Sequence, residues 1–210
     1  TWENEPDPER VAAMVKAVKA AALGWSYDVV TIGFPGPVRH DRPLHEPRNL
    51  GGGWVRYDFA RALGKPVRMI NDAAMQALGS YAGGRMLFLG PGTGLGVAVI
   101  DEGHLQPSEL AHLPYRKGLT YEDYLGTNGR RRLGRRRWER CVHEVAELFQ
   151  RALICDYVVL GGGNAKQLKT LPAHTRRGDN VNAFLGGFRL WQDASLRGRR
   201  VRASRGRGSS

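Results

Sequence analysis

The sequence lacks long hydrophobic runs, because charged and polar residues interrupt every apolar stretch before it reaches 18 residues. A helix that crosses a bilayer needs about 20 predominantly apolar residues, so we expect no membrane-spanning helix. Residues 1–10 are acidic and contain proline, unlike the basic and apolar start of a signal peptide. We therefore expect a cytoplasmic protein without a membrane partner.

Cysteine is scarce as well. Cys141 and Cys155 are the only two in the 210 residues, and they lie in different predicted elements. Small secreted proteins with disulfide frameworks carry several closely spaced pairs, so this pattern indicates reduced, partly buried thiols.

Acidic residues are missing from two segments that carry most of the arginine. Residues 130–140 hold seven arginines and one glutamate, and residues 197–207 hold six arginines and no acid. These two segments account for the whole net charge of +12. A nucleic-acid-binding domain spreads its basic face over the fold, so the pattern favours a solvated basic loop and a disordered tail. The alternative is that residues 130–140 form a binding site for a polyanion such as polyphosphate.

Elsewhere, helical and extended patterns alternate, which predicts a layered α/β fold. Apolar residues recur at helical spacing from Val11 to Val18, whereas residues 37–53 are rich in Pro, Arg and Gly and predict a long functional loop. The predicted helices span residues 8–22, 54–63, 73–82 and 138–153, with another after residue 163, and the predicted strands span residues 28–34, 66–70, 86–89, 96–100 and 156–160.

Residues 92–96 form a glycine loop between two apolar runs, a spacing typical of a β-hairpin. Gly92, Gly94 and Gly96 have no Cβ, so backbone N–H groups there can approach an anion, and Thr93 adds a hydroxyl donor. No Gly-Lys-Ser/Thr follows, which excludes a Walker A loop. A tight turn with no ligand is the alternative.

Asn71 and Asp72 follow a predicted buried strand, where open α/β folds bind their ligands. Asp72 as the N-cap of the next helix is the alternative interpretation. Asn49, Glu109 and His112 add amide, carboxylate and imidazole groups, which suit a ligand with many hydroxyls.

In order along the chain, these motifs resemble those of the ROK family of sugar kinases. The set comprises Ile-Gly-Phe-Pro-Gly, Asn49-Leu50 before Trp54, Asn71-Asp72-Ala73, the Gly-Thr-Gly-Leu-Gly loop, Glu109-x-x-His112 and residues 161–163. The Gly-Phe-Pro-Gly motif is most similar to that of the polyphosphate glucokinase branch. The resemblance covers residues 28–165 and implies an actin-like, ribonuclease H-like α/β fold of two lobes.

The resemblance also implies a function, the transfer of a phosphoryl group from ATP or polyphosphate, with Mg²⁺, to the 6-hydroxyl of glucose or a related hexose. Asp72 would be the general base. The implied contacts are Asn49, Asn71, Glu109 and His112 with the sugar, Gly92, Thr93, Gly94 and Gly96 with the donor phosphates, and Gly161, Gly162 and Gly163 with the nucleotide or polyphosphate.

The sequence departs from the family in three ways, the first being Pro91, which lies beside the glycine loop and removes one backbone donor. No Asp-x-Gly-Gly-Thr phosphate motif precedes Pro8, so we expect the first strands of the N-terminal lobe to be missing and activity to be weak or absent. No cysteine cluster follows His112, so we expect no zinc, and His112 is either a sugar contact or a packed histidine.

These considerations divide the chain into residues 1–83 (the rest of the N-terminal lobe), 84–195 (the C-terminal lobe) and 196–210 (a disordered basic tail). The expected partners are a hexose and a phosphoryl donor, with nucleic acid disfavoured and both a monomer and a homodimer left open. The alternative functions are a non-catalytic, sugar-binding regulatory relative and a polyanion-binding protein.

Overall fold

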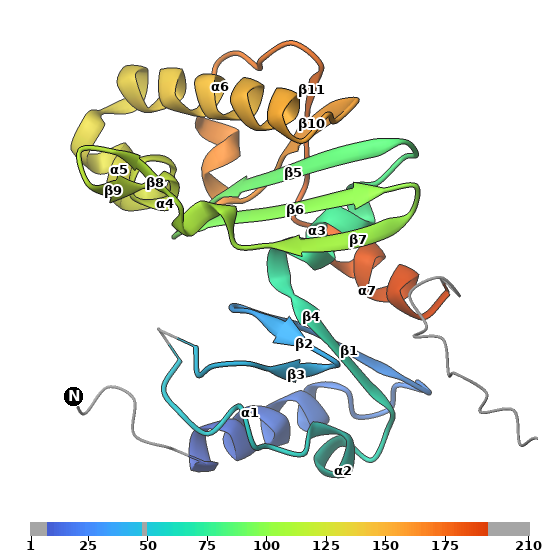
Figure 1. Ribbon diagram of the computed structural model, residues 1–210. Coiled ribbons are helices and arrows are strands. Elements are labelled where there is room, and N and C mark those ends of the chain that lie inside the picture. The colour runs from blue at the N-terminus through green and yellow to red at the C-terminus, as the bar shows by residue number, and fades with distance from the viewer. Residues whose placement is uncertain (1–7, 48–49, 193–210) are drawn as a thin grey trace, which may run out of the picture.

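A computed structural model describes residues 8–47 and 50–192. The first part of the chain forms a small parallel sheet of two strands, β1 and β4, with helices packed beside it (Figure 1). The strands pair from Val30 opposite Val67 to Phe34 opposite Asn71. The elements of this part are α1 (Pro8–Ala21), β1 (Val30–Phe34), β2 (Val38–Arg39), β3 (Arg42–Pro43), α2 (Phe59–Leu63) and β4 (Val67–Asn71).

Local chemistry explains the ends of α2. The Asp58 side chain accepts a hydrogen bond from Arg61 N–H, which satisfies a free donor at the start of the helix. Gly64 ends the helix in the left-handed conformation, with φ of 69°. The core of this part is a single apolar cluster made of Val11, Val15, Phe34, Trp54, Phe59, Leu63 and Met69.

The second part is built on a five-stranded sheet in the order β11-β10-β5-β6-β7. Strands β5 and β6 form an antiparallel hairpin, whereas β10 runs parallel to both β5 and β11. The strands of this sheet are β5 (Arg85–Pro91), β6 (Leu95–Asp101), β7 (His104–Ser108), β10 (Tyr157–Leu160) and β11 (Thr175–Arg177).

Helices cover both faces of this sheet, so its central strands are buried on two sides (Figure 1). On one face α6 packs its buried Trp138, Val142 and Val145 against β5 and β10. On the other face lie α3 and α7. The remaining elements of the second part are α3 (Asp72–Ser80), η2 (Leu110–His112), β8 (Pro114–Arg116), β9 (Leu119–Thr120), α4 (Tyr121–Leu125), α5 (Thr127–Leu133), α6 (Arg135–Ala152), η3 (Gly163–Gln167) and α7 (Asn182–Gln192).

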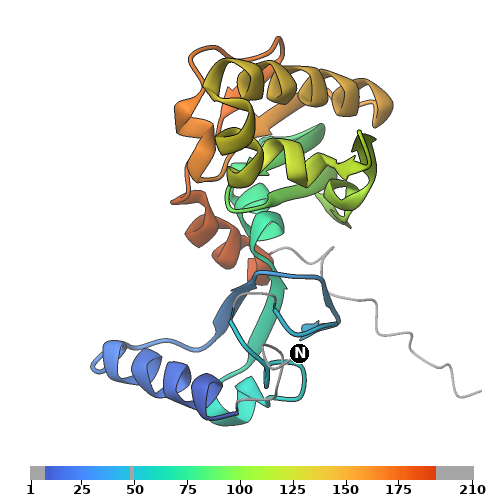
Figure 2. The same cartoon turned by 90° about the vertical axis from the view of Figure 1, so that its left-hand side faces the viewer.

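Helices α3 and α7 cross where the two parts meet (Figure 1 and Figure 2). Their backbones approach so closely that a Cβ built on Gly186 would lie 1.8 Å from the Met75 carbonyl oxygen. Helix α7 also reaches the small sheet, because Thr31 Oγ1 donates to Gly187 O at 2.9 Å and accepts from Trp191 Nε1 at 2.8 Å. The α7 helix therefore joins the two parts.

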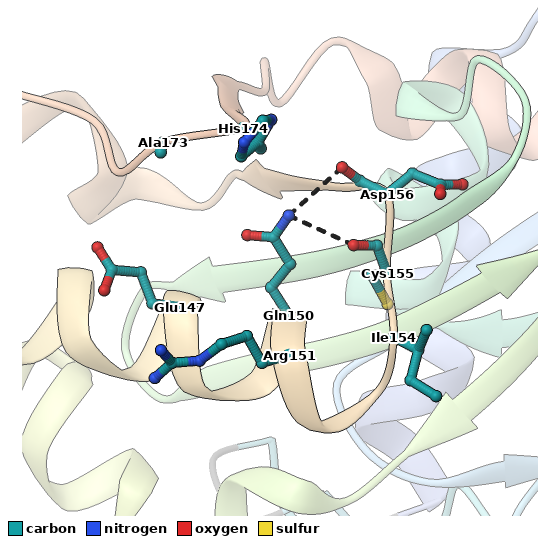
Figure 3. A pocket seen from close by; sticks show the side chains of 8 residues that line it. All are labelled: Glu147, Gln150, Arg151, Ile154, Cys155, Asp156, Ala173 and His174. Carbon is teal, nitrogen blue, oxygen red and sulfur yellow. Dashed lines mark hydrogen bonds between the residues drawn. The ribbon is translucent and has the colours of Figure 1, made fainter.

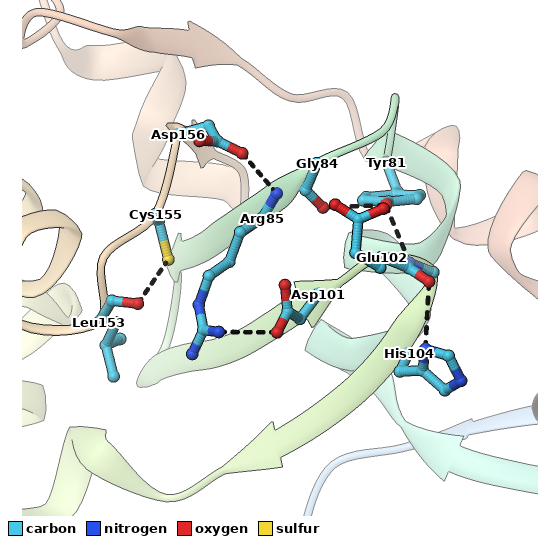
Figure 4. Close-up of polar contacts among 10 residues, drawn as sticks. Tyr81, Gly84, Arg85, Asp101, Glu102, His104, Leu153, Cys155 and Asp156 are labelled. Carbon is cyan, nitrogen blue, oxygen red and sulfur yellow. Dashed lines mark hydrogen bonds and ion pairs between the residues drawn. The ribbon is translucent and has the colours of Figure 1, made fainter.

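Polar contacts close the end of the β5–β6 hairpin that lies opposite the glycine loop (Figure 4). Arg85 Nη1 donates to Asp101 at 2.7 Å, and the Arg85 N–H donates to the Asp156 carboxylate at 2.7 Å. A cavity of about 510 Å³ lies nearby, beside the C-terminal end of α6 (Figure 3), and another of about 450 Å³ is lined by Arg85 and Asp101. Neither cavity is lined by a residue that the sequence singles out for function.

Several sequence predictions need correction. The stretch predicted as a loop contains the short β2–β3 hairpin, and the helix predicted from residue 54 begins only at Phe59. The helix predicted after residue 163 is a single 3₁₀ segment. Residues 130–140, predicted as a basic loop, belong to α5 and α6, because the buried Trp138 and the partly buried Leu133 anchor these helices to the core.

In the described ranges, no helix combines the length and the apolar character that a membrane crossing requires. The predicted tail and Asn49 lie outside the described residues.

Candidate active site

Asn71 is the last residue of β4 and the N-cap of α3. Its side-chain oxygen accepts from Ala73 N–H at 3.0 Å and Ala74 N–H at 3.1 Å, and its Nδ2 donates to Gly36 O at 3.2 Å. The structure thus gives the capping role to Asn71, where the sequence had left it open for Asp72. The second Nδ2 hydrogen of Asn71 has no partner among residues 8–47 and 50–192, so it can bond a ligand.

Asp72 is the first residue of α3, and its side chain is exposed to solvent. Its carboxylate accepts from Ala73 N–H at 2.8 Å. The protein around this carboxyl raises its pKa above the ordinary value by desolvation, an effect that backbone hydrogen bonds partly oppose. Asp72 therefore combines access to solvent with a raised pKa.

Two glycines allow neighbouring strands to approach the first turn of α3. A Cβ built on Gly33 of β1 would lie 3.6 Å from Asp72 Cα and 2.6 Å from the end of the Met75 side chain. A Cβ built on Gly96 of β6 would lie 2.3 Å from Ala73 Cβ. The start of α3, directly after Asp72, is consequently in contact with Gly96 at the end of the glycine loop.

The glycine loop is the turn of the β5–β6 hairpin, and Gly92 N–H donates to Gly94 O at 2.9 Å. Gly92 O accepts from Thr127 N–H, Thr127 Oγ1 and Asn164 Nδ2, each at 2.9 Å. Within the described part of the chain, the backbone N–H groups of Thr93 and Gly94 make no hydrogen bond. Two adjacent free donors of this kind suit an anionic ligand.

Glu109 and His112 also lie together, since Glu109 is the N-cap of the short helix η2 and His112 is its last residue. His112 Nδ1 is 3.2 Å from Glu109 Oε2, and His112 Nε2 is 3.8 Å from Glu122 Oε2. Glu122 Oε2 in turn accepts from Leu95 N–H at 3.1 Å. Glu122 therefore links the predicted sugar-contact pair to the glycine loop.

Glu122 and Asn164 were missed by the sequence reasoning. Thr120 and Asp123 form a capping box. The corresponding sequence motif, Thr-x-x-Asp, predicts a helix start around Glu122. Asn164 is only 9% exposed and bonds Gly92 O and Thr127 Oγ1. No sequence signal marked Asn164, because its role depends on the close packing of η3 against the loop.

The triple glycine is packed against the same loop. Strand β10 runs parallel to β5, so both end at one edge of the sheet, and Gly161 N–H donates to Leu89 O at 2.9 Å. Gly162 has φ of 73°, and a Cβ on it would lie 2.6 Å from Pro91 O. Gly163 has open space around it. The two glycine segments are thus neighbours at the sheet edge.

In the ranges that the structure describes, no three His, Cys, Asp or Glu side chains are grouped closely enough to hold a metal ion. Cys141 and Cys155 are buried free thiols, and burial raises the pKa of each. The expectation of no zinc remains a prediction.

Searches with the sequence match no family model and no curated protein. The structure is similar to that of the inorganic polyphosphate/ATP-glucomannokinase from Arthrobacter sp. strain KM, with a TM-score of 0.68 and 27% identity, over 86% of this chain and 79% of that one. It is similar to a ROK family glucokinase from Streptomyces griseus, solved with glucose and AMPPNP, with a TM-score of 0.72 and 16% identity, over 90% of each chain. It is also similar to the ROK hexokinase from Thermus thermophilus, with a TM-score of 0.61 and 23% identity, over 90% of this chain and 89% of that one.

These similarities confirm the predicted resemblance to ROK sugar kinases and the two-lobed, actin-like α/β fold.

Proposed function

We propose that this chain, which has the fold of the ROK family of sugar kinases, transfers a phosphoryl group from ATP or polyphosphate to the 6-hydroxyl of glucose or a related hexose. The observation that carries the proposal is the meeting of three features. The free N–H groups lie in the turn of the β5–β6 hairpin; Asp72 is connected to this hairpin through its neighbour Ala73, which meets Gly96, and the Glu109–His112 pair is connected to it through Glu122.

Asp72 is the proposed general base. The sugar oxygen attacks the terminal phosphorus, its proton passes to the Asp72 carboxylate, and the bond from that phosphorus to the bridging oxygen breaks. The products are a sugar 6-phosphate and either ADP or a polyphosphate shortened by one unit. A raised pKa supports this role, because a base is more effective when its pKa lies closer to the working pH.

The sugar contacts are proposed for Glu109, His112 and the free Nδ2 hydrogen of Asn71. Carboxylate oxygens accept hydrogen bonds from hydroxyl groups, whereas the amide donates to them, and the imidazole does one or the other according to its tautomer. Asn49 keeps its sequence-based assignment as a fourth contact. Glu122 joins this group because it lies between His112 and the loop.

The donor phosphates are proposed to bind residues 92–96, with residues 161–163 beside them. Mg²⁺ in kinases is held by one or two carboxylates together with substrate phosphates, and Glu122, which accepts from Leu95 N–H at the glycine loop, would supply one such carboxylate. When bound, the ion would neutralise charge that develops on the transferred group. Polyphosphate use is supported by the likeness to the Arthrobacter enzyme, which is named for both donors.

An assay of sugar 6-phosphate formation tests this proposal, with the wild-type chain and the Asp72→Asn variant given glucose and either donor. Loss of the base lowers kcat by about 10²–10⁴-fold, the usual contribution of general base catalysis. The matched control is Asp28→Asn, an exposed carboxylate of the loop before β1, which keeps wild-type activity. Full activity of Asp72→Asn would refute the assignment.

The pH dependence gives a second readout. Asp72 acts only when deprotonated, so kcat/KM falls as the pH drops through its pKa in the free enzyme. Because that pKa is raised, the fall of kcat/KM on the acidic side of the pH profile occurs above the ordinary aspartate pKa of about 3.9. If kcat/KM falls only at or below that ordinary pKa, burial does not raise the pKa of Asp72.

A further inference from the structure

The arginines of residues 130–140 form a basic surface on α5 and the first turns of α6. Six of them have exposed side chains, whereas Arg130 is half-buried. We call the exposed set the arginine track; its members are Arg131, Arg132, Arg135, Arg136, Arg137 and Arg140.

The arginine track begins next to the glycine loop. Thr127, the first residue of α5, donates its N–H and its hydroxyl to Gly92 O. A Cβ on Gly126 would lie 2.9 Å from Thr93 O, so the helix start and the loop are in direct contact. Arg130 N–H closes the first turn of α5 by bonding Gly126 O at 3.0 Å. The arginines then continue along the chain away from the loop.

Little within the protein balances this charge. In the described residues no salt bridge involves a member of the track. Glu139 is the one acid in the segment; its carboxylate accepts from the backbone N–H groups of Lys169 at 2.6 Å and Thr170 at 3.0 Å, and it also interacts electrostatically with Arg135. Arg132 is held in place, because it donates to Asp123 O at 2.9 Å and lies 5.0 Å from the centre of the Tyr124 ring.

The placement of the charge is also unfavourable for the helices themselves. Helix α6 starts with three consecutive arginines, has no acid in its first turn and has no side-chain N-cap. Cations at a helix N-terminus oppose the helix dipole, and like charges four residues apart repel each other. A bound polyanion would relieve both effects.

We propose that the arginine track binds the distal part of a linear inorganic polyphosphate whose terminal phosphate lies in the glycine loop. The inference rests on the proposed function and names its phosphoryl donor. A polyphosphate carries negative charge along its whole length, so it gains from a cluster of cations that follows the helix start in contact with the loop. ATP has three phosphates followed by an uncharged nucleoside, which this cluster does not match.

A single-stranded nucleic acid is the competing polyanion. Proteins that bind such strands add aromatic side chains on which the bases stack. Residues 126–140 contain one aromatic residue, Trp138, which is 0% exposed in the core. The track therefore offers charge without a stacking platform, which favours polyphosphate.

The test compares the whole chain with the triple variant Arg131→Gln/Arg135→Gln/Arg136→Gln. The control is Arg199→Gln/Arg200→Gln/Arg202→Gln, which removes the same charge from the C-terminal tail. Affinity for long-chain polyphosphate and for tripolyphosphate is measured over a series of salt concentrations, and thermal unfolding checks that both variants fold.

The track variant is expected to bind long-chain polyphosphate at least about tenfold more weakly and to lose about 2 from the slope of log K against log salt. Tripolyphosphate binding and the KM for ATP stay within about twofold, because the loop is intact. Equal losses in the control variant, or an oligonucleotide of equal charge that binds the same arginines more tightly, overturn the proposal.

The two proposals fail in different ways. If neither donor supports sugar phosphorylation but polyphosphate binding still depends on the track, the kinase proposal fails and the binding site stands. If both donors support sugar phosphorylation and the track variant keeps the wild-type KM for polyphosphate, the kinase proposal is upheld. The proposal that the arginine track binds polyphosphate is then wrong.

Discussion

The sheet of β1 and β4 and the five-stranded sheet of the second part are protected to very different degrees. In the small sheet only Phe34 and Met69 are fully buried, and the other strand residues keep partial exposure. In the large sheet β5, β6 and β10 carry runs of buried residues, because helices cover both faces. Segments with few buried apolar contacts open first in local unfolding. The comparison therefore assigns the lower local stability to the first part.

The proposed site draws on both parts in unequal measure. Gly33, Asn71 and the strand leading to Asp72 come from the less protected sheet, whereas the glycine loop, Glu122 and Asn164 belong to the well-packed one. The proposed donor side therefore lies on the better-packed sheet, and the position of the proposed base depends on how firmly the small sheet is attached. Helix α7 supplies that attachment.

The α3–α7 crossing gives the largest expected effect. Replacing Gly186 by alanine places a Cβ 1.8 Å from the Met75 carbonyl oxygen, which forces the two helices apart. Overpacking of this kind costs about 3 kcal/mol of unfolding free energy. Denaturant unfolding followed by circular dichroism measures the change.

The neighbouring Gly187 provides the matched control. A Cβ there would meet Thr31 at 3.5 Å, which is an ordinary contact, so Gly187→Ala gains helix propensity of up to about 1 kcal/mol. Equal stabilities of the two variants would show that the crossing does not join the two parts in the way described.

Two buried tryptophans allow a direct comparison of the cores. Trp138 in the second part donates Nε1 to Leu125 O at 2.8 Å, whereas Trp54 Nε1 in the first part is buried without a partner among the described residues. Trp138→Phe is expected to cost about 2 kcal/mol, since it loses a buried hydrogen bond and some packing. Trp54→Phe is expected to cost less than about 1 kcal/mol, because removing an unsatisfied donor offsets the lost packing.

The same unfolding experiment measures both variants. A larger loss from Trp54→Phe than from Trp138→Phe would reverse the comparison between the two cores.

Much of the fold was readable from sequence, because it depends on local patterns. The apolar run at Tyr157–Leu160 and the glycines between β5 and β6 predicted a strand and a hairpin that the structure confirms. Strand β7 was missed, since it is an edge strand with polar residues and a proline. The arginine segment was predicted as a solvated loop from its concentrated charge, whereas the buried Trp138 anchors it as part of α5 and α6.

The site was predictable only as far as its members lie in recognisable motifs. Asp72 and the glycine loop were assigned to one site by the family resemblance, since the strands beside them belong to two different sheets and no strand pairing links them. Glu122 and Asn164 were not found, since each bonds to a backbone group of residues 92–95 that is distant in sequence. The assignments of individual site residues to sugar and phosphate stay predictions.

An effect smaller than the loss of Trp138 concerns the attachment of the small sheet. Thr31→Val keeps the shape of the side chain but removes the hydroxyl that donates to Gly187 O and accepts from Trp191 Nε1. Loss of these bonds is expected to cost about 1 kcal/mol. Because they tie β1 to α7, amide hydrogen exchange should speed up in β1 and β4 while β5 and β10 keep their protection. Uniform acceleration of exchange across both sheets would mean that the two parts unfold as one unit. The different extent to which helices cover the two sheets would then have no consequence for their stability.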